Sequence, residues 1–214
     1  MQKIYLTEIY KSIQGESSYS GLPCSFVRLS GCPLRCRWCD TVYSYKKGLE
    51  YTFDKLFNEL EDLDCQLVEL TGGEPLCQEA VFPLMEQLIG KNYKVLLETS
   101  GAYCIKKVPK EVHIIMDLKC PDSLMVEKNL WSNLDYLKSS DELKFVIASE
   151  KDFSWAKEKI DKLKLSSRFK VLLSPAFGLF KEEKLVELLL KEKIDCRLNL
   201  QLHKYIWNPR KKGV

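Results

Sequence analysis

The sequence has no apolar run that approaches membrane-spanning length, and it lacks a strong excess of charge. The N-terminus, M-Q-K-I-Y-L-T-E-I-Y, has no continuous apolar region of the kind that a secretory signal peptide needs. The 33 basic and 30 acidic residues leave a formal charge of +3, which gives no argument for a nucleic-acid or membrane-surface partner. We expect a cytoplasmic protein without such partners, in which the C-terminal R-K-K lies in a solvated tail.

Closely spaced cysteines are also absent, except in one stretch. Residues 31–41 read G-C-P-L-R-C-R-W-C-D-T and place Cys32, Cys36 and Cys39 in a C-x3-C-x2-C pattern. A structural zinc site normally takes a fourth ligand from a second Cys or His pair, and no such pair follows at short spacing. Three thiolates with an open fourth position suit a [4Fe–4S] cluster. A zinc knuckle or three buried thiols is the alternative for this loop.

The other cysteines stand singly. The total of nine is odd, and in a chain without a signal peptide this favours thiols and metal ligation over a disulfide framework. We expect most of the remaining six to be small buried apolar residues: Cys24, Cys65, Cys77, Cys104, Cys120 and Cys196.

Apolar periodicity predicts alternating strands and helices. Six short runs rich in Val, Ile and Leu are typical of buried parallel strands: residues 25–29, 67–70, 94–97, 112–116, 143–148 and 170–173. Helical spacing of apolar positions predicts helices over residues 52–63, 79–89, 152–163 and 182–193. Thr52 and Asp152 are the expected N-caps. Residues 126–137 are compatible with either a helix or a loop.

This alternation indicates an α/β fold with a parallel sheet and right-handed crossovers. A complete eightfold barrel needs about 250 residues, so 214 residues fit an incomplete (β/α)6 TIM-type barrel better. A doubly wound sheet is the structural alternative. In a barrel, chemistry is expected at the C-terminal ends of the strands.

Polar motifs fall at those strand ends. They are T-G-G-E-P at residues 71–75, E-T-S-G at residues 98–101, D-L-K-C-P from Asp117, and L-S-P-A-F-G around Ser174. Paired glycines allow a ligand to approach the backbone closely, and Asp117 and Lys119 share one face of a strand by period-two alternation. Each motif also has an ordinary interpretation as a turn, a helix cap or an ion pair.

The spacing C-x3-C-x-aromatic-C, with Trp38 as the aromatic residue, resembles the signature of radical S-adenosylmethionine enzymes. The resemblance favours the barrel and implies that Cys32, Cys36 and Cys39 hold a [4Fe–4S] cluster and are catalytic. It implies that the open iron binds S-adenosylmethionine, whose cleavage yields a 5′-deoxyadenosyl radical. The residues that it assigns to this cofactor are Trp38, Cys39, Asp40, Gly72, Gly73, Glu74, Ser100, Asp117, Leu118, Lys119, Ser174 and Pro175.

Flanking blocks narrow the resemblance. Y-K-S-I-Q-G-E at residues 10–16 and L-N-L-Q-L-H-K-Y-I-W-N-P at residues 198–209 are similar to those of 7-carboxy-7-deazaguanine synthases, as is the order of the blocks between them. The resemblance implies a lyase that converts 6-carboxy-5,6,7,8-tetrahydropterin to 7-carboxy-7-deazaguanine with loss of ammonia, in queuosine and 7-deazapurine biosynthesis. It also implies reuse of S-adenosylmethionine, Mg²⁺ on Thr41, an electron donor such as a flavodoxin, and a homodimer.

The same resemblance divides the single domain into a substrate-binding extension (residues 1–22), a barrel core (23–180) and a C-terminal helix with a substrate-side segment (181–214). Arg28 suits a substrate carboxylate, and Gln14 and Glu16 suit an aminopyrimidinone edge. Asp40 is a possible helper at the metal. The chain continues past Pro209, which argues against a terminal-carboxylate contact there. The implied substrate residues are Ile13, Gln14, Gly15, Glu16, Arg28, Thr71, His203 and Pro209.

Two other functions stay open at this point. A glycyl-radical-enzyme activase shares the core but acts on a protein backbone, and it is expected to lack the Q-G-E and L-H-K-Y blocks. A non-catalytic iron–sulfur or zinc protein has no reason to carry T-G-G-E-P after the second apolar run. Binding of S-adenosylmethionine and of the pterin distinguishes the three.

Overall fold

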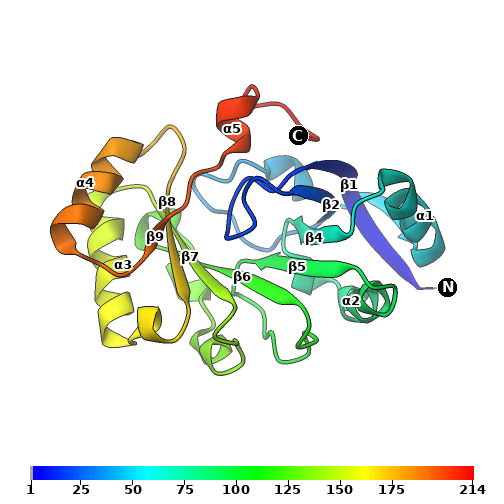
Figure 1. The fold of residues 1–214 in the computed structure, drawn as a ribbon, viewed down its shortest axis with the longest axis horizontal. Helices are drawn as coiled ribbons and strands as arrows, with labels where there is room; N and C mark the ends of the chain where they lie inside the picture. The colour runs from blue at the N-terminus through cyan, green and yellow to red at the C-terminus, as the bar shows by residue number, and fades with distance from the viewer. Residues whose placement is uncertain (1) are drawn as a thin grey trace.

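The computed structural model describes residues 2–214 as one nine-stranded sheet with the order β3-β1-β2-β4-β5-β6-β7-β8-β9 (Figure 1). The six central strands are parallel and follow chain order. A doubly wound sheet would reverse its strand order at a switch point, so the incomplete barrel is the correct prediction. The central strands are β2 (Pro23–Leu29), β4 (Leu67–Gly72), β5 (Lys94–Thr99), β6 (His113–Leu118), β7 (Glu142–Ile147) and β8 (Lys170–Pro175).

Each central strand overlaps one of the predicted apolar runs. Four of them, β4, β5, β6 and β8, continue two residues further toward their C-terminal ends than the apolar pattern indicates. The polar residues Thr71, Thr99 and Asp117 therefore belong to the strands themselves. Strand geometry, and not a flexible loop, positions these side chains.

The two edges of the sheet carry strands that the sequence did not predict. The long strand β1 (Lys3–Ile13) is antiparallel to both β2 and β3 (Leu49–Thr52), and the two-residue strand β9 (Arg197–Leu198) pairs with β8. Strand β1 contains many polar residues, and β3 and β9 are too short to show a pattern. Because β3 and β9 are not paired, the barrel stays open along one side.

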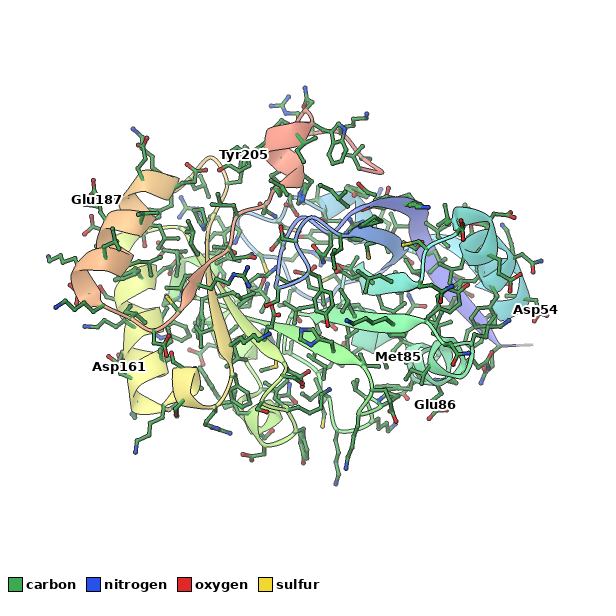
Figure 2. The ribbon with its side chains drawn as sticks, in the orientation of Figure 1. Asp54, Met85, Glu86, Asp161, Glu187 and Tyr205 are labelled. Atoms are coloured by element: carbon green, nitrogen blue, oxygen red, sulfur yellow. The ribbon has the colours of Figure 1, made fainter. Side chains whose placement is uncertain are left out.

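Helices cover the outer face of the sheet. Figure 1 shows α1 and α2 near one end of the sheet and α3 and α4 near the other, while α5 lies apart from them. Figure 2 shows the exposed residues Asp54, Glu86, Asp161 and Glu187 at the surface of α1 to α4, as amphipathic helices require. The helices are α1 (Phe53–Leu63), α2 (Val81–Gly90), α3 (Glu150–Lys162), α4 (Glu182–Glu192) and α5 (His203–Ile206).

The connections after β5 and β6 contain no α-helix. The stretch 126–137, for which helix and loop were both possible, forms the 3₁₀ turns η4 (Val126–Lys128) and η5 (Trp131–Asp135). The buried side chain of Asn133 holds this region by donating to the carbonyl oxygens of Gly101 and Tyr103, at 3.2 and 2.8 Å. Side-chain bonds to the backbone thus replace a helix here.

One of the two predicted helix caps is correct and the other is wrong. Thr52 caps α1 by accepting from the Lys55 amide at 3.3 Å. Helix α3 begins earlier than expected, because Ser149 is its N-cap and accepts from the amide of Asp152 at 3.2 Å. The Asp152 carboxylate is instead buried and accepts from the amides of Asp122 and Ala148.

The replacement Ser149→Ala is expected to lower the free energy of unfolding by about 1 kcal/mol, because it removes this cap. Urea denaturation followed by circular dichroism measures the change. The control is Ser154→Ala, which removes an exposed hydroxyl bonded only to the Glu150 carbonyl within the same helix. This control is expected to be neutral or slightly stabilising, and equal losses in both variants would contradict the cap assignment.

Apolar residues form a large core between the sheet and the helices, and a second, smaller cluster inside the barrel. The inner cluster contains Cys24, Phe26, Leu67, Leu96 and Ile115, all among the first four residues of their strands. Apart from the pair of His113 and Glu142 at the starts of β6 and β7, this end of the interior is mainly apolar, whereas the C-terminal ends of the strands carry polar residues. In the described part of the chain, no helix has the length and apolar character to span a membrane.

Candidate active site

A cavity of about 610 Å³ lies at the C-terminal ends of the central strands. Its wall includes the ends of β4, β5, β6 and β8 and the cysteine loop that follows β2. The structure brings most of the predicted site residues to this cavity: Ile13, Gln14, Gly15, Glu16, Arg28, Cys32, Cys36, Trp38, Cys39, Asp40, Thr41, Thr71, Gly72, Gly73, Ser100, Asp117, Lys119, Ser174, Pro175, His203 and Pro209.

The cysteine loop presents three free thiols to the cavity. Burial raises the pKa of Cys32 and of Cys36. Within residues 2–214, no group of three or more His, Cys, Asp or Glu side chains is arranged to hold a single metal ion. A [4Fe–4S] cluster has a different requirement, because each thiolate binds a different iron. Three free thiols on one loop are the donor set that such a cluster uses.

Backbone hydrogen bonds and one arginine fix the base of this loop. The amide of Glu74 donates to the Gly31 carbonyl oxygen at 2.9 Å. The guanidinium of Arg35 donates to the carbonyl oxygen of Cys32 at 2.7 Å and lies 4.2 Å from the centre of the Tyr45 ring. The loop is thereby held against the end of β4.

Two glycines allow the ends of β2 and β4 to approach each other closely. Gly72 has a φ of +146°, and a β-carbon there would lie 2.2 Å from the carbonyl oxygen of Leu29. At Gly73, a β-carbon would lie 2.2 Å from the carbonyl oxygen of Gly31. Because both neighbours are backbone atoms, neither position has room for a larger residue.

Two candidate cofactor residues lie outside the cavity wall. The Glu74 carboxylate is fully buried and accepts from the Leu76 amide at 3.0 Å, the Thr99 hydroxyl at 2.8 Å and the Ser100 amide at 2.7 Å. It ties the ends of β4 and β5 together, and the assignment of Glu74 to the cofactor stays a prediction. Leu118 is fully buried in the large core because period-two alternation turns it away from Asp117.

Asp117 and Lys119 both face the cavity, as strand alternation predicts. The Lys119 ammonium lies 2.8 Å from the Asp117 carboxylate. Burial opposes the charge on Lys119, but Asp117 and Cys36 outweigh this effect and raise its pKa. The second carboxylate oxygen of Asp117 is buried and has no hydrogen-bond partner among the described residues. That oxygen is an available acceptor beside the cysteine loop.

The opposite side of the cavity is built around Glu16, in the loop between β1 and β2. Its carboxylate accepts from the Lys144 ammonium at 2.9 Å, the Gln201 amide at 2.9 Å and the Asn199 amide at 3.2 Å. Burial alone would raise the pKa of Glu16, but Lys144 and Gln201 outweigh burial and lower it. Glu16 is therefore ionised and held by three donors.

Gln14 has a supporting position. Its side-chain amide donates to the buried carboxyl of Glu69, and its oxygen accepts from the Glu16 amide at 2.6 Å. Burial and the neighbouring Glu98 and Glu16 raise the pKa of Glu69 well above its usual range. Since both ends of the Gln14 amide are already bonded, this residue fixes the turn that carries Glu16.

Sequence reasoning missed part of this side of the cavity. Glu69 and Lys144 are charged residues inside buried strands, and that mismatch was the available signal, since such groups are rarely buried without a partner. Glu98, the first residue of the E-T-S-G motif, bonds to Lys144 and to Thr71. Asn199 offered no comparable signal because its role depends on the register of the C-terminal segment.

Arg28 lines the cavity but is not free. Its guanidinium lies 2.7 Å from the Glu8 carboxylate and donates to the Tyr10 hydroxyl at 3.0 Å. The Tyr43 hydroxyl donates to the same Glu8 carboxylate at 2.9 Å. A substrate carboxylate at Arg28 would have to share it with Glu8.

Asp40 and Thr41 lie where the cysteine loop meets helix α5. The Lys204 ammonium is 2.6 Å from the Asp40 carboxylate, and the Thr41 hydroxyl donates to the same carboxylate at 2.9 Å. Burial opposes the charge on Asp40, but Lys204 and Thr41 outweigh it and keep the pKa of Asp40 well below its usual range. The two residues offer hard oxygen atoms at the edge of the cavity.

His203 packs directly against Gly15. A β-carbon at Gly15 would lie 2.2 Å from Nδ1 of His203, and the Leu202 amide donates to the Gly15 carbonyl oxygen at 2.8 Å. Burial lowers the pKa of His203, so the imidazole is neutral at neutral pH. The other histidine, His113, lies outside the cavity.

The C-terminal residues, which were expected to form a solvated tail, lie beside the site. Residues 208–213 are exposed, as expected, yet residues 209–214 line the mouth of the cavity. The Lys212 ammonium lies 4.1 Å from the centre of the Tyr43 ring. Figure 1 shows this segment following α5 on the side of the molecule that carries β1 and β2. The basic residues Arg210, Lys211 and Lys212 thus form part of the cavity wall.

A buried carboxylate, that of Glu142, lies at the N-terminal end of the barrel interior. Glu142, at the start of β7, accepts from the Ser18 amide at 3.1 Å and lies 3.2 Å from His113 Nε2. Burial would raise the pKa of Glu142, but the bonds from His113 and Ser18 outweigh it and lower the pKa. Glu142 therefore anchors the loop that carries Glu16.

The variant Glu142→Gln is expected to lose about 2 kcal/mol of stability at pH 7, because it loses charge-assisted hydrogen bonds. Because the pKa of Glu142 is lower in the folded protein than in the unfolded chain, where it is about 4.3, the ionised carboxylate stabilises the fold at pH values above about 4.3. This stabilisation is lost as the pH falls toward the pKa of the folded protein. The gap in melting temperature between wild type and variant should therefore narrow from pH 7 to pH 3.5. A constant gap would contradict an ionised Glu142.

The comparisons with known proteins agree with this geometry. Residues 26–189 match the Radical SAM superfamily. The chain belongs to this superfamily, whose members hold a [4Fe–4S] cluster and S-adenosylmethionine. It is 44% identical to the 7-carboxy-7-deazaguanine synthase of Koribacter versatilis (strain Ellin345), over 98% of this chain and 99% of that protein. It is 41% identical to the enzyme of the same name from Chlorobaculum tepidum, over 98% of this chain and 96% of that protein.

The chain is thus a radical SAM enzyme of the 7-carboxy-7-deazaguanine synthase family. A solved structure supports the fold: the crystal structure of QueE from Escherichia coli superposes with a TM-score of 0.78 at 21% identity. The match covers 94% of this chain and 95% of that one.

Proposed function

We propose that this enzyme converts 6-carboxy-5,6,7,8-tetrahydropterin to 7-carboxy-7-deazaguanine with release of ammonia. One observation carries the proposal: a single cavity is lined by the three thiols on one side and by Gln14, Gly15 and Glu16 on the other. Its volume of about 610 Å³ lies within the usual range of small-molecule sites. The names of the similar enzymes support the product, 7-carboxy-7-deazaguanine, while the pterin substrate and the release of ammonia are our proposal.

The thiol side would hold the cofactors. When bound, the cluster and S-adenosylmethionine supply one-electron cleavage and hydrogen-atom abstraction. Cys32, Cys36 and Cys39 would ligate the cluster, since they are free, half-buried and face the cavity. The free Asp117 oxygen is suited to a hydroxyl or ammonium donor of S-adenosylmethionine, and Gly72 and Gly73 leave backbone groups accessible.

The carboxylate side would hold the pterin. Glu16 and Glu98 are acceptors suited to the N–H donors of an aminopyrimidinone edge. The substrate carboxylate would be attracted by Arg28 and by the basic residues at the cavity mouth, among them Lys212. His203, neutral and packed on Gly15, would form one wall.

Mg²⁺ belongs to the same proposal. The Thr41 hydroxyl uses its hydrogen toward Asp40 and keeps its lone pairs, so both residues offer oxygen ligands at the cavity edge. Mg²⁺ commonly uses only one or two protein oxygens and completes its shell with substrate and water. Bound there, it would neutralise the substrate carboxylate. An external one-electron donor such as a flavodoxin and a homodimeric assembly complete the proposal.

The test is an anaerobic assay of cluster-reconstituted protein with dithionite, S-adenosylmethionine, Mg²⁺ and the pterin, read by mass spectrometry. Formation of 7-carboxy-7-deazaguanine supports the proposal. Formation of 5′-deoxyadenosine without that product would refute the substrate and favour a different radical reaction, such as activation of a glycyl-radical enzyme. A cluster-loaded protein that yields neither compound would refute the catalytic role.

A further inference from the structure

Lys144 is a charged residue inside the barrel whose role neither the motif comparison nor the reaction explains. It lies in the middle of β7 (Glu142–Ile147), and only 6% of its side chain is exposed. Its neighbours along the strand, Leu143 and Phe145, are fully buried in the large core on the opposite face. Strand alternation therefore turns Lys144 into the cavity.

The ammonium of Lys144 bridges two carboxylates from different parts of the fold. It lies 2.9 Å from Glu16, in the loop between β1 and β2, and it is bonded to Glu98 on β5. Burial opposes a charge on Lys144, yet Glu16 and Glu98 outweigh burial and raise its pKa well above the usual range. The lysine is therefore a permanent cation between two anions.

Without this cation, the two carboxylates would repel each other in a poorly solvated site, and one of them would take up a proton or turn away. The other contacts differ between the two. Glu16 is also held by Gln201 and Asn199, whereas Glu98 has only the Thr71 hydroxyl, at 3.2 Å. Loss of Lys144 should therefore disturb Glu98 most.

We propose that Lys144 is a positioning residue for the substrate, which holds Glu16 and Glu98 as a fixed pair of acceptors on the cavity wall. A carboxylate has about four acceptor positions, and Glu98 uses only two of them on protein groups. The remaining positions suit the parallel N–H donors of a planar heterocycle. This inference rests on the proposed function, because the pterin is the ligand that would use them.

The variant Lys144→Met keeps the length of the side chain and removes the charge. We expect its KM for the pterin to rise about 30-fold or more, the effect typical of removing one partner of a buried charge pair. Cleavage of S-adenosylmethionine without pterin should stay near the wild-type rate, because Lys144 does not touch the cysteine loop. Lys144→Arg keeps the charge and should recover a substantial part of the affinity.

The control variant is Lys170→Met, an exposed lysine at the start of the neighbouring strand β8, whose KM should not change. If Lys144→Met does not retain its cluster, the double variant Lys144→Met with Glu98→Gln removes one charge of each sign and takes its place. Its KM should be close to that of Glu98→Gln alone, because Lys144 acts mainly through the Glu98 carboxylate, and the two losses adding in full would overturn the role of Lys144.

The outcomes separate this inference from the proposed function. An active wild type with an unchanged KM in Lys144→Met would overturn the role of Lys144 and leave the reaction in place. A fall in kcat with unchanged KM, or an equal loss of pterin-free cleavage, would also overturn it by indicating a general structural defect. A wild type that cleaves S-adenosylmethionine but makes no product would overturn both.

Discussion

Replacing Cys36 with alanine is expected to abolish product formation and the cluster together. The three cysteines of the cysteine loop are the only closely spaced cysteines in the sequence, and each would bind one iron of the cluster. With one thiolate missing, that iron loses its protein ligand. The reconstituted variant should show little iron–sulfur absorbance, no 5′-deoxyadenosine and no 7-carboxy-7-deazaguanine.

The matched control is Cys104→Ala. Cys104 is also a free cysteine, but it is exposed and lies outside the cavity wall. This variant should retain iron content, absorbance and activity. Equal losses in both variants would indicate nonspecific damage, while full activity in Cys36→Ala would refute the assignment of the cluster to this loop.

The second large effect is expected at Gly73, where the ends of β4 and β2 meet. In Gly73→Ala the new β-carbon would lie 2.2 Å from the Gly31 carbonyl oxygen, so the backbone must shift. The shift breaks the bond from the Glu74 amide to that oxygen, at the base of the cysteine loop. We expect a loss of about 3 kcal/mol, at the upper end of overpacking costs, and a melting temperature lower by about 6–12 °C.

The same variant should bind S-adenosylmethionine weakly, because Gly73 and the cysteine loop line one wall of the cavity. Calorimetry of the cluster-loaded protein measures this affinity. Gly90→Ala is the control, since a β-carbon at Gly90, the last residue of α2, meets nothing within 4 Å. That control should melt at or slightly above the wild-type temperature. Two variants of equal stability would contradict the close approach.

Much of the barrel was predictable because its strands are buried on both faces. Such strands read as continuous apolar runs, and all six were located correctly from them. The unpredicted parts depend on contacts distant in sequence. The connection after β6 has no α-helix and is held by hydrogen bonds from the Asn133 side chain to the carbonyl oxygens of Gly101 and Tyr103. Nothing in the sequence around Asn133 indicates those partners.

The candidate site divides in the same way. Motif spacing correctly brought Cys36, Thr71 and Asp117 to one cavity, because strand ends meet at one edge of a parallel sheet. Motifs do not reveal which groups a side chain contacts in the folded protein. The Glu74 carboxylate bonds to Thr99 on β5, and Arg28 is paired with Glu8. Those pairings arise only when neighbouring strands set the register.

The open side of the barrel has a consequence for the order in which the molecule is assembled. The Ser17 amide donates to Asn199 at 2.7 Å, across 182 positions of sequence, and Glu16 meets Gln201 in the same region. Contacts of such long range form late in folding, since a large loop must close first. The cysteine loop also depends on distant residues, since the Arg37 amide donates to the Ser123 carbonyl oxygen at 3.2 Å and Asp40 pairs with Lys204. Both sides of the site are therefore complete only after the C-terminal segment has been synthesised and has packed against the barrel.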